Sequence, residues 1–405
     1  MKPIVLDIFC GAGGMSEGFI QAGFDVAFAC DINKDAELTY INRHAQLGYD
    51  VKFACEDIRK FSQQEYLKQF IGDAKVDIVC GGPPCQGFSL AGKRDQNDPR
   101  NMLFKHYIET IKNVSPKYFV MENVEGILSM KFDKFEGPSG IVYTEKTVPE
   151  ILISEFYKLD YKVEYKILQA NDFGVPQNRR RVFFFGHKIR KMDEKNFVSL
   201  VTSPRFPERN IEQDVTVKDA IDDLAFLESG HTNKKYPRRK NYSRYQLESI
   251  NGRTPNKGGT PIKARSLNNH QASRHTKDVI KRFALLESGE NLSQLRQRLG
   301  EDQWNDHATK KLRCQRIKGN EPSPTVLTLP DDLVHYSKNR IMTVREFARI
   351  QSFDDSFEFL GKRTTGGERR KVDLPQYTQV GNAVPPLLAK AVASEIMQAL
   401  MNKII

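Results

Sequence analysis

The sequence has no apolar run long enough to span a membrane, and its six cysteines contain no C-x-x-C pair. The apolar segment after Met1 is too short for a secretory signal and is interrupted by Asp7. Because four of the cysteines end or follow predicted strands, we interpret them as reduced thiols of a cytoplasmic protein, with neither a disulfide framework nor a metal site. The chain has 28% charged and 39% apolar residues, which is typical of a globular protein, and 405 residues suffice for two domains.

Acidic residues are scarce in one window of the chain. Between His231 and Arg282 there are 14 lysines and arginines against two acids, a local charge of +12 in a chain whose net charge is +11. This concentration favours a polyanionic partner over the alternative of a solvated basic face. Within the window, tyrosines alternate with cations that suit phosphate contacts, namely Lys234, Lys235, Arg238, Arg239, Lys240 and Arg244.

Strands and helices alternate from Pro3 to about Lys188, which predicts an α/β fold with a doubly wound, mostly parallel sheet. The predicted strands are Ile4–Phe9, Val26–Cys30, Val51–Ala54, Val76–Cys80, Tyr118–Glu122, Lys162–Leu168 and Val182–Gly186. The predicted helices are Ser16–Gln21, Lys34–Arg43, Gln64–Phe70, Leu103–Val114 and Val148–Lys158, with later ones at Thr343–Gln351 and from Pro385 to about Met401.

The character of the chain changes after Lys188, where proline, asparagine, arginine and lysine become more frequent. We therefore expect a catalytic and cofactor-binding domain at 1–188 and a second, smaller mixed domain at 189–330. A return segment at 331–375 and a terminal segment at 376–405 would complete the first domain.

The sequence places Cys85 on a rigid turn. A β-branched run ends at Cys80, two glycines break it, and Pro83-Pro84 stiffens the backbone immediately before the thiol. Open α/β sheets bind their ligands at this edge, so we interpret Cys85 as a nucleophile. The alternative is a buried structural cysteine in an ordinary loop.

A glycine-rich turn follows the first strand and has the sequence Gly11-Ala-Gly-Gly14. It matches neither G-x-G-x-x-G nor a Walker A loop, which argues against a dinucleotide and a nucleoside triphosphate. Asp31 ends the second strand, where an acid meets ribose hydroxyls, and Asp57 follows the third, where a carboxylate could accept from an adenine amine. Two acids without neighbouring basic residues to bind a phosphate suit a nucleoside that carries no phosphate. S-adenosylmethionine is the leading candidate.

Glu122 ends the fifth predicted strand, beside the strand that leads to Cys85. Partial desolvation there favours a protonated carboxyl, which could pair with a nucleophile in adding to a heterocycle. Arg179 and Arg181 share one side of a strand by the period of two and could orient that carboxyl. The alternatives are a helix-capping or salt-bridged acid and a basic surface strand.

Taken in order, these motifs resemble the DNA (cytosine-5) methyltransferase family. The resemblance covers about 1–188 and 320–400 and leaves out 189–320, where that family has a variable target-recognition domain. It is carried by Asp7-Ile-Phe-Cys-Gly-Ala-Gly-Gly14, Gly82-Pro-Pro-Cys-Gln-Gly-Phe-Ser89, Asp98-Pro-Arg-Asn-Met-Leu-Phe104, Glu122-Asn-Val124, Gln177-x-Arg-x-Arg181, Ser323-Pro-Thr-Val-Leu327 and Gly381-Asn-Ala-Val-Pro-Pro386.

The resemblance implies that the Cys85 thiolate attacks C6 of a cytosine flipped out of the duplex, because the stacked base is out of reach. Glu122 would contact N3 and the exocyclic amine, and Arg179 and Arg181 would orient Glu122 and the cytosine O2. The expected S-adenosylmethionine contacts are Phe9, Gly11, Ala12, Gly13, Gly14, Asp31, Ile32, Asp57, Ile58, Pro83, Leu103, Asn382 and Ala383. A loop closing over double-stranded DNA would add Gln86, Ser89, Lys93 and Arg94 to the six cations of the basic window.

This chain departs from the family pattern at two positions, since Asp31 is shorter than the glutamate often found there and Ile32 replaces an aromatic residue. The resemblance further implies a metal-free, nucleoid-associated monomer of prokaryotic type, with a cognate restriction endonuclease as a candidate partner. Two alternatives stay open. One is an RNA-directed relative, whose Cys-Phe-Thr signature is absent here, and the other is a catalytically idle DNA-binding protein on the same scaffold.

Overall fold

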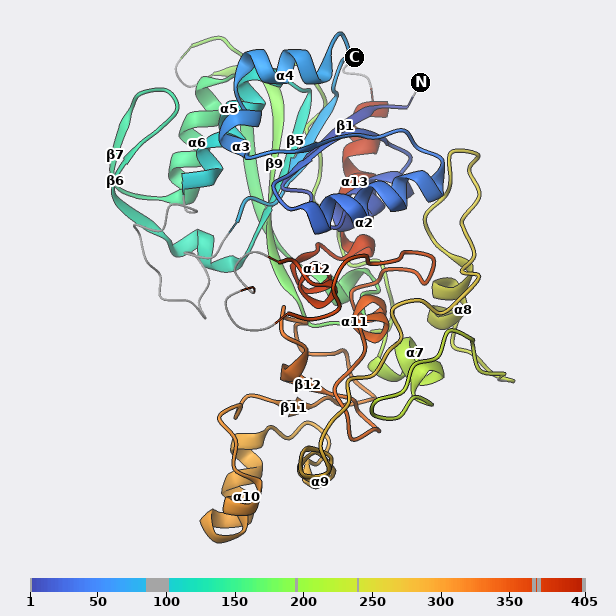
Figure 1. Cartoon of the computed structure of the whole chain (residues 1–405). Coiled ribbons are helices and arrows are strands. Elements are labelled where there is room, and N and C mark those ends of the chain that lie inside the picture. Colours follow the sequence, from blue (N-terminus) through green and yellow to red (C-terminus); the bar gives the residue numbers. More distant parts are fainter. Residues whose placement is uncertain are drawn as a thin grey trace.

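The computed structural model describes residues 2–84, 102–193, 196–238, 240–365, 369 and 373–402. Its centre is an eight-stranded sheet in the order β10-β9-β5-β4-β1-β2-β3, with β8 paired to the other side of β9 (Figure 1). Strands β1 to β5 pair in parallel, whereas β8, β9 and β10 pair antiparallel. The prediction of a mostly parallel α/β sheet is confirmed. The strands are β1 (Ile4–Ile8), β2 (Asp25–Asp31), β3 (Lys52–Cys55), β4 (Ile78–Gly81), β5 (Tyr118–Asn123), β8 (Tyr161–Gln169), β9 (Arg180–Lys191) and β10 (Phe197–Ser199).

Helices cover both faces of this sheet because consecutive strand residues alternate between two cores. Leu6, Val79 and Phe119 pack against one layer of helices, and their neighbours Val5, Ile78 and Val120 pack against the other. The first layer contains α3 (Ile58–Phe61), α4 (Gln64–Ile71), α5 (Leu103–Val114) and α6 (Val148–Lys158), and the second contains α1 (Gly14–Gln21), α2 (Lys34–Leu47) and α13 (Pro386–Met401).

The C-terminal helix α13 packs against α1 in the second layer. At Gly18 of α1 an added Cβ would lie 2.4 Å from the Cβ of Ala389 in α13, so the two helix backbones meet closely at this glycine. Helix α13 therefore packs in the same core as β1, which begins at Ile4.

The lower part of the molecule in Figure 1 consists of short elements joined by long connections. One small core there combines Phe283, Leu295, Trp304, Val334 and Ile341. The elements of this region are α7 (Val217–Ile221), α8 (Arg244–Asn251), α9 (Lys277–Leu285), α10 (Leu292–Trp304), β11 (Gln315–Arg316) and β12 (Leu333–Val334), followed by α11 (Val344–Ile350) and α12 (Gln376–Asn382).

Buried ion pairs connect α11 to the segments around Asp223, Arg340 and Asp355. Arg349 pairs with Asp223 and Asp355, and Arg340 pairs with Glu346; every one of these side chains is buried. Such pairs fix the relative position of the segments that carry them, because separating a buried guanidinium group from its carboxylate would leave a charge unpaired in the interior.

Two features differ from the sequence prediction. The hairpin of β6 (Lys131–Glu136) and β7 (Val142–Thr147) was missed, because its buried Phe132 and Phe135 are three residues apart and break the period of two. Strand β9 continues to Lys191 and β10 joins its end, so the sheet runs past residue 188. The division into domains stays a prediction. Within the described ranges, every helix is too short or too polar to cross a membrane.

Candidate active site

A cleft of about 1600 Å³ lies along the carboxyl ends of the parallel strands. One wall comes from the sheet and the other from residues far along the chain. The sheet side contributes Phe9 to Ala12, Asp31 to Asn33, Glu56 to Arg59, Gly82 to Pro84 and Glu122 to Val124; the far side contributes Lys310 to Arg313, Pro324 to Leu329 and Gly381 to Val384, with Arg179 and Arg181 between them.

The glycine turn takes its shape from two left-handed residues. Gly11 and Gly13 have φ of +52° and +95°, a region that favours glycine. An added Cβ at Gly11 would meet nothing within 4 Å, so the space above this residue is open. The backbone amide of Gly11 donates to Asp31 Oδ2 at 2.9 Å, which joins the turn to the end of β2.

Gly14 is required for a reason that the sequence does not reveal. An added Cβ there would lie 2.2 Å from the carbonyl oxygen of Val384, so this glycine lets the C-terminal segment pack onto the glycine turn. Gly13 likewise faces the protein, since its added Cβ would lie 3.0 Å from the Tyr40 ring. Of the residues expected to bind the cofactor, Gly13 is the one that does not line the cleft; all the others do.

The two expected cofactor acids are held by backbone amides. Asp31 accepts from Gly11 and also from Asn33, at 2.9 Å each, and burial raises the pKa of its carboxyl. Asp57 caps α3 by accepting from the Arg59 amide. The Arg59 guanidinium pairs with the same carboxylate at 2.5 Å and holds the pKa of Asp57 below its usual value.

Glu122 stands at the end of β5 with Arg181 beside it, their charged atoms 3.0 Å apart. Burial raises the pKa of Glu122, and the guanidinium groups of Arg181 and Arg179 offset only part of this effect. Gly82 approaches Glu122 closely, since an added Cβ would lie 3.0 Å from Glu122 Oε2. The carboxyl thus lies next to the loop that leaves β4 with a pKa raised by burial.

Cys85, the expected nucleophile, lies outside the described residues. The structure does describe Pro83 and Pro84, which line the cleft immediately before it. Asn123 donates from Nδ2 to the carbonyl of Pro83 at 3.0 Å, so the residue after Glu122 anchors the entry to the loop. The chain thus reaches residue 84 within the same cleft as the Glu122 carboxyl.

The two expected arginines have different partners. Arg181 contacts Glu122, as predicted. Arg179 is buried and donates to the carbonyl oxygens of Val326, Gly381 and Ala383 at 3.2, 3.1 and 3.3 Å, which joins the start of β9 to both segments of the far wall. The positive charge of Arg179 lowers the pKa of Glu122. Arg179 therefore acts on this carboxyl through its charge, while its hydrogen bonds hold the segments of the far wall in place.

The expected DNA contacts fall into two groups. Gln86, Ser89, Lys93, Arg94 and Arg239 lie outside the described residues. The other five, Lys234, Lys235, Arg238, Lys240 and Arg244, are exposed, but none of them lines the cleft.

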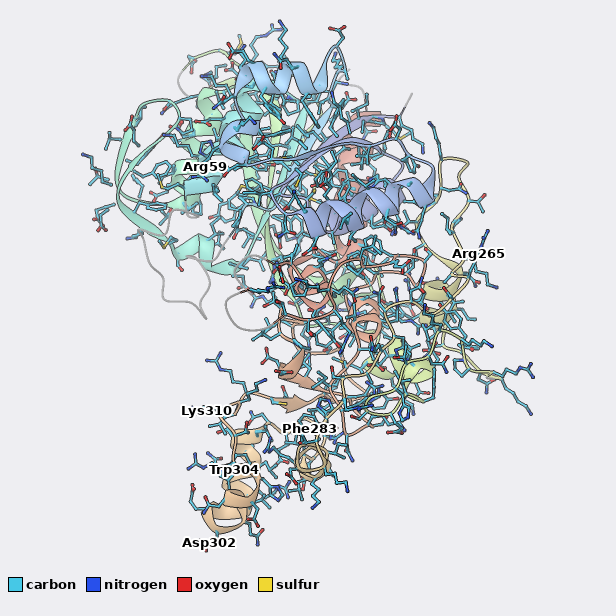
Figure 2. All side chains as sticks on the ribbon, viewed as in Figure 1. Arg59, Arg265, Phe283, Asp302, Trp304 and Lys310 are labelled. Carbon is cyan, nitrogen blue, oxygen red and sulfur yellow. The ribbon has the colours of Figure 1, made fainter. Side chains whose placement is uncertain are left out.

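The cations that do line the cleft come from a segment that sequence reasoning missed. Lys310, Lys311 and Arg313 belong to the far wall, across from Glu122 and Arg59. Figure 2 shows Arg59 and Lys310 on the same side of the molecule, Arg59 in its upper part and Lys310 in its lower part, and both residues line the cleft. The sequence does contain a short run of cations after α10 that could have indicated these residues. The prediction of DNA contacts instead followed the window from His231 to Arg282, where cations are more numerous.

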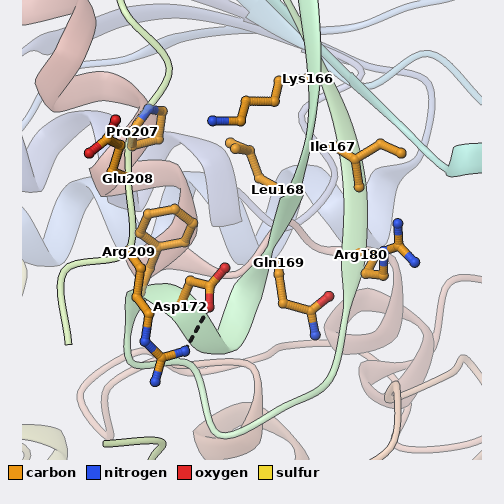
Figure 3. Close-up of a pocket in the computed structure, with 10 residues that line it drawn as sticks. Lys166, Ile167, Leu168, Gln169, Asp172, Arg180, Pro207, Glu208 and Arg209 are labelled. Carbon is orange, nitrogen blue, oxygen red and sulfur yellow. Dashed lines mark hydrogen bonds and ion pairs between the residues drawn. The ribbon is translucent and has the colours of Figure 1, made fainter. Parts of the chain in front are cut away.

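A smaller pocket of about 440 Å³ opens between β8, β9 and the segment at 207–209 (Figure 3). Arg209 and Asp172 pair across it at 2.7 Å. None of the expected site residues that the structure describes lines this pocket, whereas Glu122, Arg179 and Arg181 line the larger cleft.

These features define the class of protein. A mostly parallel sheet with a glycine turn, two acids at the next strand ends and a partly exposed acid–arginine pair in the cleft is an α/β enzyme with the methyltransferase fold. The family model of C-5 cytosine-specific DNA methylase matches residues 4–398. The chain belongs to this family and is a DNA (cytosine-5-)-methyltransferase.

Individual relatives match along most of their length. The chain is 38% identical over 401 residues to the type II methyltransferase M.DdeI of Desulfomicrobium norvegicum, covering 97% of this chain and 88% of the relative. It is 33% identical to the type II methyltransferase M1.HphI of Haemophilus parahaemolyticus, covering 100% and 89%. Among solved structures, an E. coli prophage-encoded protein described as a DNA modification methyltransferase superposes with a TM-score of 0.71 at 25% identity, covering 99% of this chain and 100% of that one.

Proposed function

We propose that this protein transfers a methyl group from S-adenosylmethionine to C5 of a cytosine flipped out of a specific duplex DNA sequence, through a covalent adduct with Cys85. The observation that carries the proposal is the Glu122–Arg181 pair, which lies at the end of β5 beside the loop that leads to Cys85. Membership of the family supplies the reaction type, and the cleft supplies room for both a nucleoside cofactor and an extruded base.

The residues present fit S-adenosylmethionine. The open space above Gly11 accepts a ligand against the backbone, and Asp31 and Asp57 stand at the ends of β2 and β3. Ile32 is 67% exposed beside them, an apolar surface suited to one face of an adenine ring. When bound, the cofactor supplies an electrophilic methyl group.

In the proposed mechanism the Cys85 thiolate forms a bond to C6 of the cytosine, and the ring electrons move toward N3. Glu122 holds a proton at N3 and so stabilises the charge that develops there. Arg181 keeps the carboxyl in place at 3.0 Å. C5 then takes the methyl group as its bond to the sulfonium breaks. The C5 proton is lost to solvent, the C5–C6 double bond re-forms and the thiolate leaves C6.

Two further parts of the proposal concern partners. The relatives M.DdeI and M1.HphI are named type II methyltransferases, which supports a role in restriction–modification with a cognate endonuclease. We expect a monomer located with the DNA in the cytoplasm. Lys310, Lys311 and Arg313 line the same cleft as Glu122, and Lys310 and Arg313 suit the phosphates of the target strand, whereas Lys311 already pairs with Asp331.

Replacement of Cys85 by alanine tests the mechanism. We expect incorporation of tritiated methyl into duplex DNA to fall to background while DNA binding persists, because the thiol is needed for the adduct but not for phosphate contacts. Turnover by C85A would refute the covalent route. A duplex with 5-fluorocytosine at the target position provides a second readout, since fluorine cannot leave as a cation and the wild-type protein should stay attached under denaturing conditions.

The substrate is tested by offering the wild-type protein duplex DNA and transfer RNA in parallel. Incorporation into transfer RNA alone would favour the RNA-directed alternative and overturn the DNA assignment. Bisulfite sequencing of DNA from expressing cells would then identify the recognised sequence.

A further inference from the structure

We propose that the side of the molecule opposite the cleft binds a second segment of duplex DNA while the first occupies the cleft. This inference rests on the proposed function, because it takes DNA as the polyanion that the enzyme meets. The surface concerned, called the basic face below, consists of the exposed cations Lys234, Lys235, Arg238, Lys240, Lys257, Lys263 and Arg265.

The basic face carries charge of one sign. In the part of the chain that the structure describes, none of its seven cations forms an ion pair with a carboxylate. The acids closest in sequence already have partners, since Glu228 pairs with Lys338 and Glu248 pairs with Arg244 and Arg253. A surface that serves solubility alone intersperses both signs, because a block of like charges repels itself. An unpaired cationic surface gains most from a partner with regularly spaced phosphates.

The segments of the basic face are fixed to one another and to the body of the protein. The amide of Leu267 donates to the carbonyl of Lys234 at 2.8 Å, which ties the first basic segment to the second. The amide of Lys257 donates to the carbonyl of Leu47 at the end of α2, also at 2.8 Å. The cations are therefore presented on a folded surface and not on a loose tail.

The basic face lies away from the cleft. None of its residues lines the cleft, whose far wall carries its own cations at 310–313. In Figure 2, Arg265 lies at the opposite side of the molecule from Arg59 and Lys310, the two labelled cleft residues. Because these cations lie outside the cleft, a duplex seated in the cleft leaves them available, and we infer that they bind a separate segment of DNA.

The stoichiometry of short duplexes tests the proposal. With 14-base-pair duplex DNA at low salt, native mass spectrometry of the wild-type protein should show two duplexes per chain. The triple variant K257Q/K263Q/R265Q should bind one duplex and methylate it with unchanged kcat/KM. The matched control K68Q/K75Q/K112Q removes three exposed lysines around α4 and α5 and should still bind two duplexes.

Long DNA gives a second readout. For duplexes of several hundred base pairs, the slope of log affinity against log salt should become less steep in the triple variant by about 0.9 per cation removed, and stay unchanged in the control. A single duplex per wild-type chain, or two duplexes on the triple variant, would overturn the inference. If the wild type methylates DNA but binds one duplex, only the second site fails; if it does not methylate DNA at all, the proposed function fails.

Discussion

Replacement of Arg179 by lysine should destabilise the protein far more than the same change at its neighbour Arg180. The Arg179 guanidinium is buried and donates to three carbonyl oxygens, on Val326, Gly381 and Ala383. A lysine ammonium is a compact donor that cannot span all three, so at least two buried carbonyls lose a charged partner. Each loss costs about 1–2 kcal/mol, which predicts a fall of roughly 2–4 kcal/mol in the free energy of unfolding.

Arg180 is the matched control for this prediction. It pairs with Glu125 at 3.1 Å, but its side chain is 56% exposed, so R180K should change the free energy of unfolding by less than about 0.5 kcal/mol. Urea unfolding followed by tryptophan fluorescence and circular dichroism measures both variants. Because Arg179 holds the wall that carries Asn382 and Ala383, R179K should also raise the KM for S-adenosylmethionine more than it lowers kcat. Equal unfolding midpoints for R179K and R180K would refute the argument that these carbonyl bonds hold the cleft together.

Three further predictions concern the cleft. Glu122→Gln should lower kcat/KM by about 10²–10⁴. Because burial raises the pKa of Glu122 and the protonated form is the donor, wild-type kcat/KM should fall as pH rises through that pKa, and a Gln variant that kept the same decline would contradict the assignment. Gly14→Ala should weaken S-adenosylmethionine binding, measured by calorimetry, because its Cβ would lie 2.2 Å from the Val384 oxygen; unchanged affinity would show that the turn can shift freely. K310Q/R313Q should raise the KM for a short duplex and flatten its salt dependence by about 0.9 per cation, and an unchanged salt slope would remove these residues from the DNA path.

The pattern of apolar residues was sufficient to predict the sheet and its helices. Leu103–Val114 and Val148–Lys158 form helices with the predicted bounds, and Glu122 and Asp31 stand at the ends of their strands as expected. These features are local, since they depend on the period of a strand or helix and on where a run of apolar residues stops.

Contacts between distant segments could not be predicted in this way. Arg179 bonds to Gly381 across 202 positions, and Gly14 is needed because Val384 packs against it. The sequence likewise pointed to the basic window, whereas the cleft carries the cations at 310–313. The sequence alone determined which residue types reach the ends of the strands. Tertiary structure decided which side chains face one another across the cleft, because that depends on how segments hundreds of residues apart return to the same edge of the sheet.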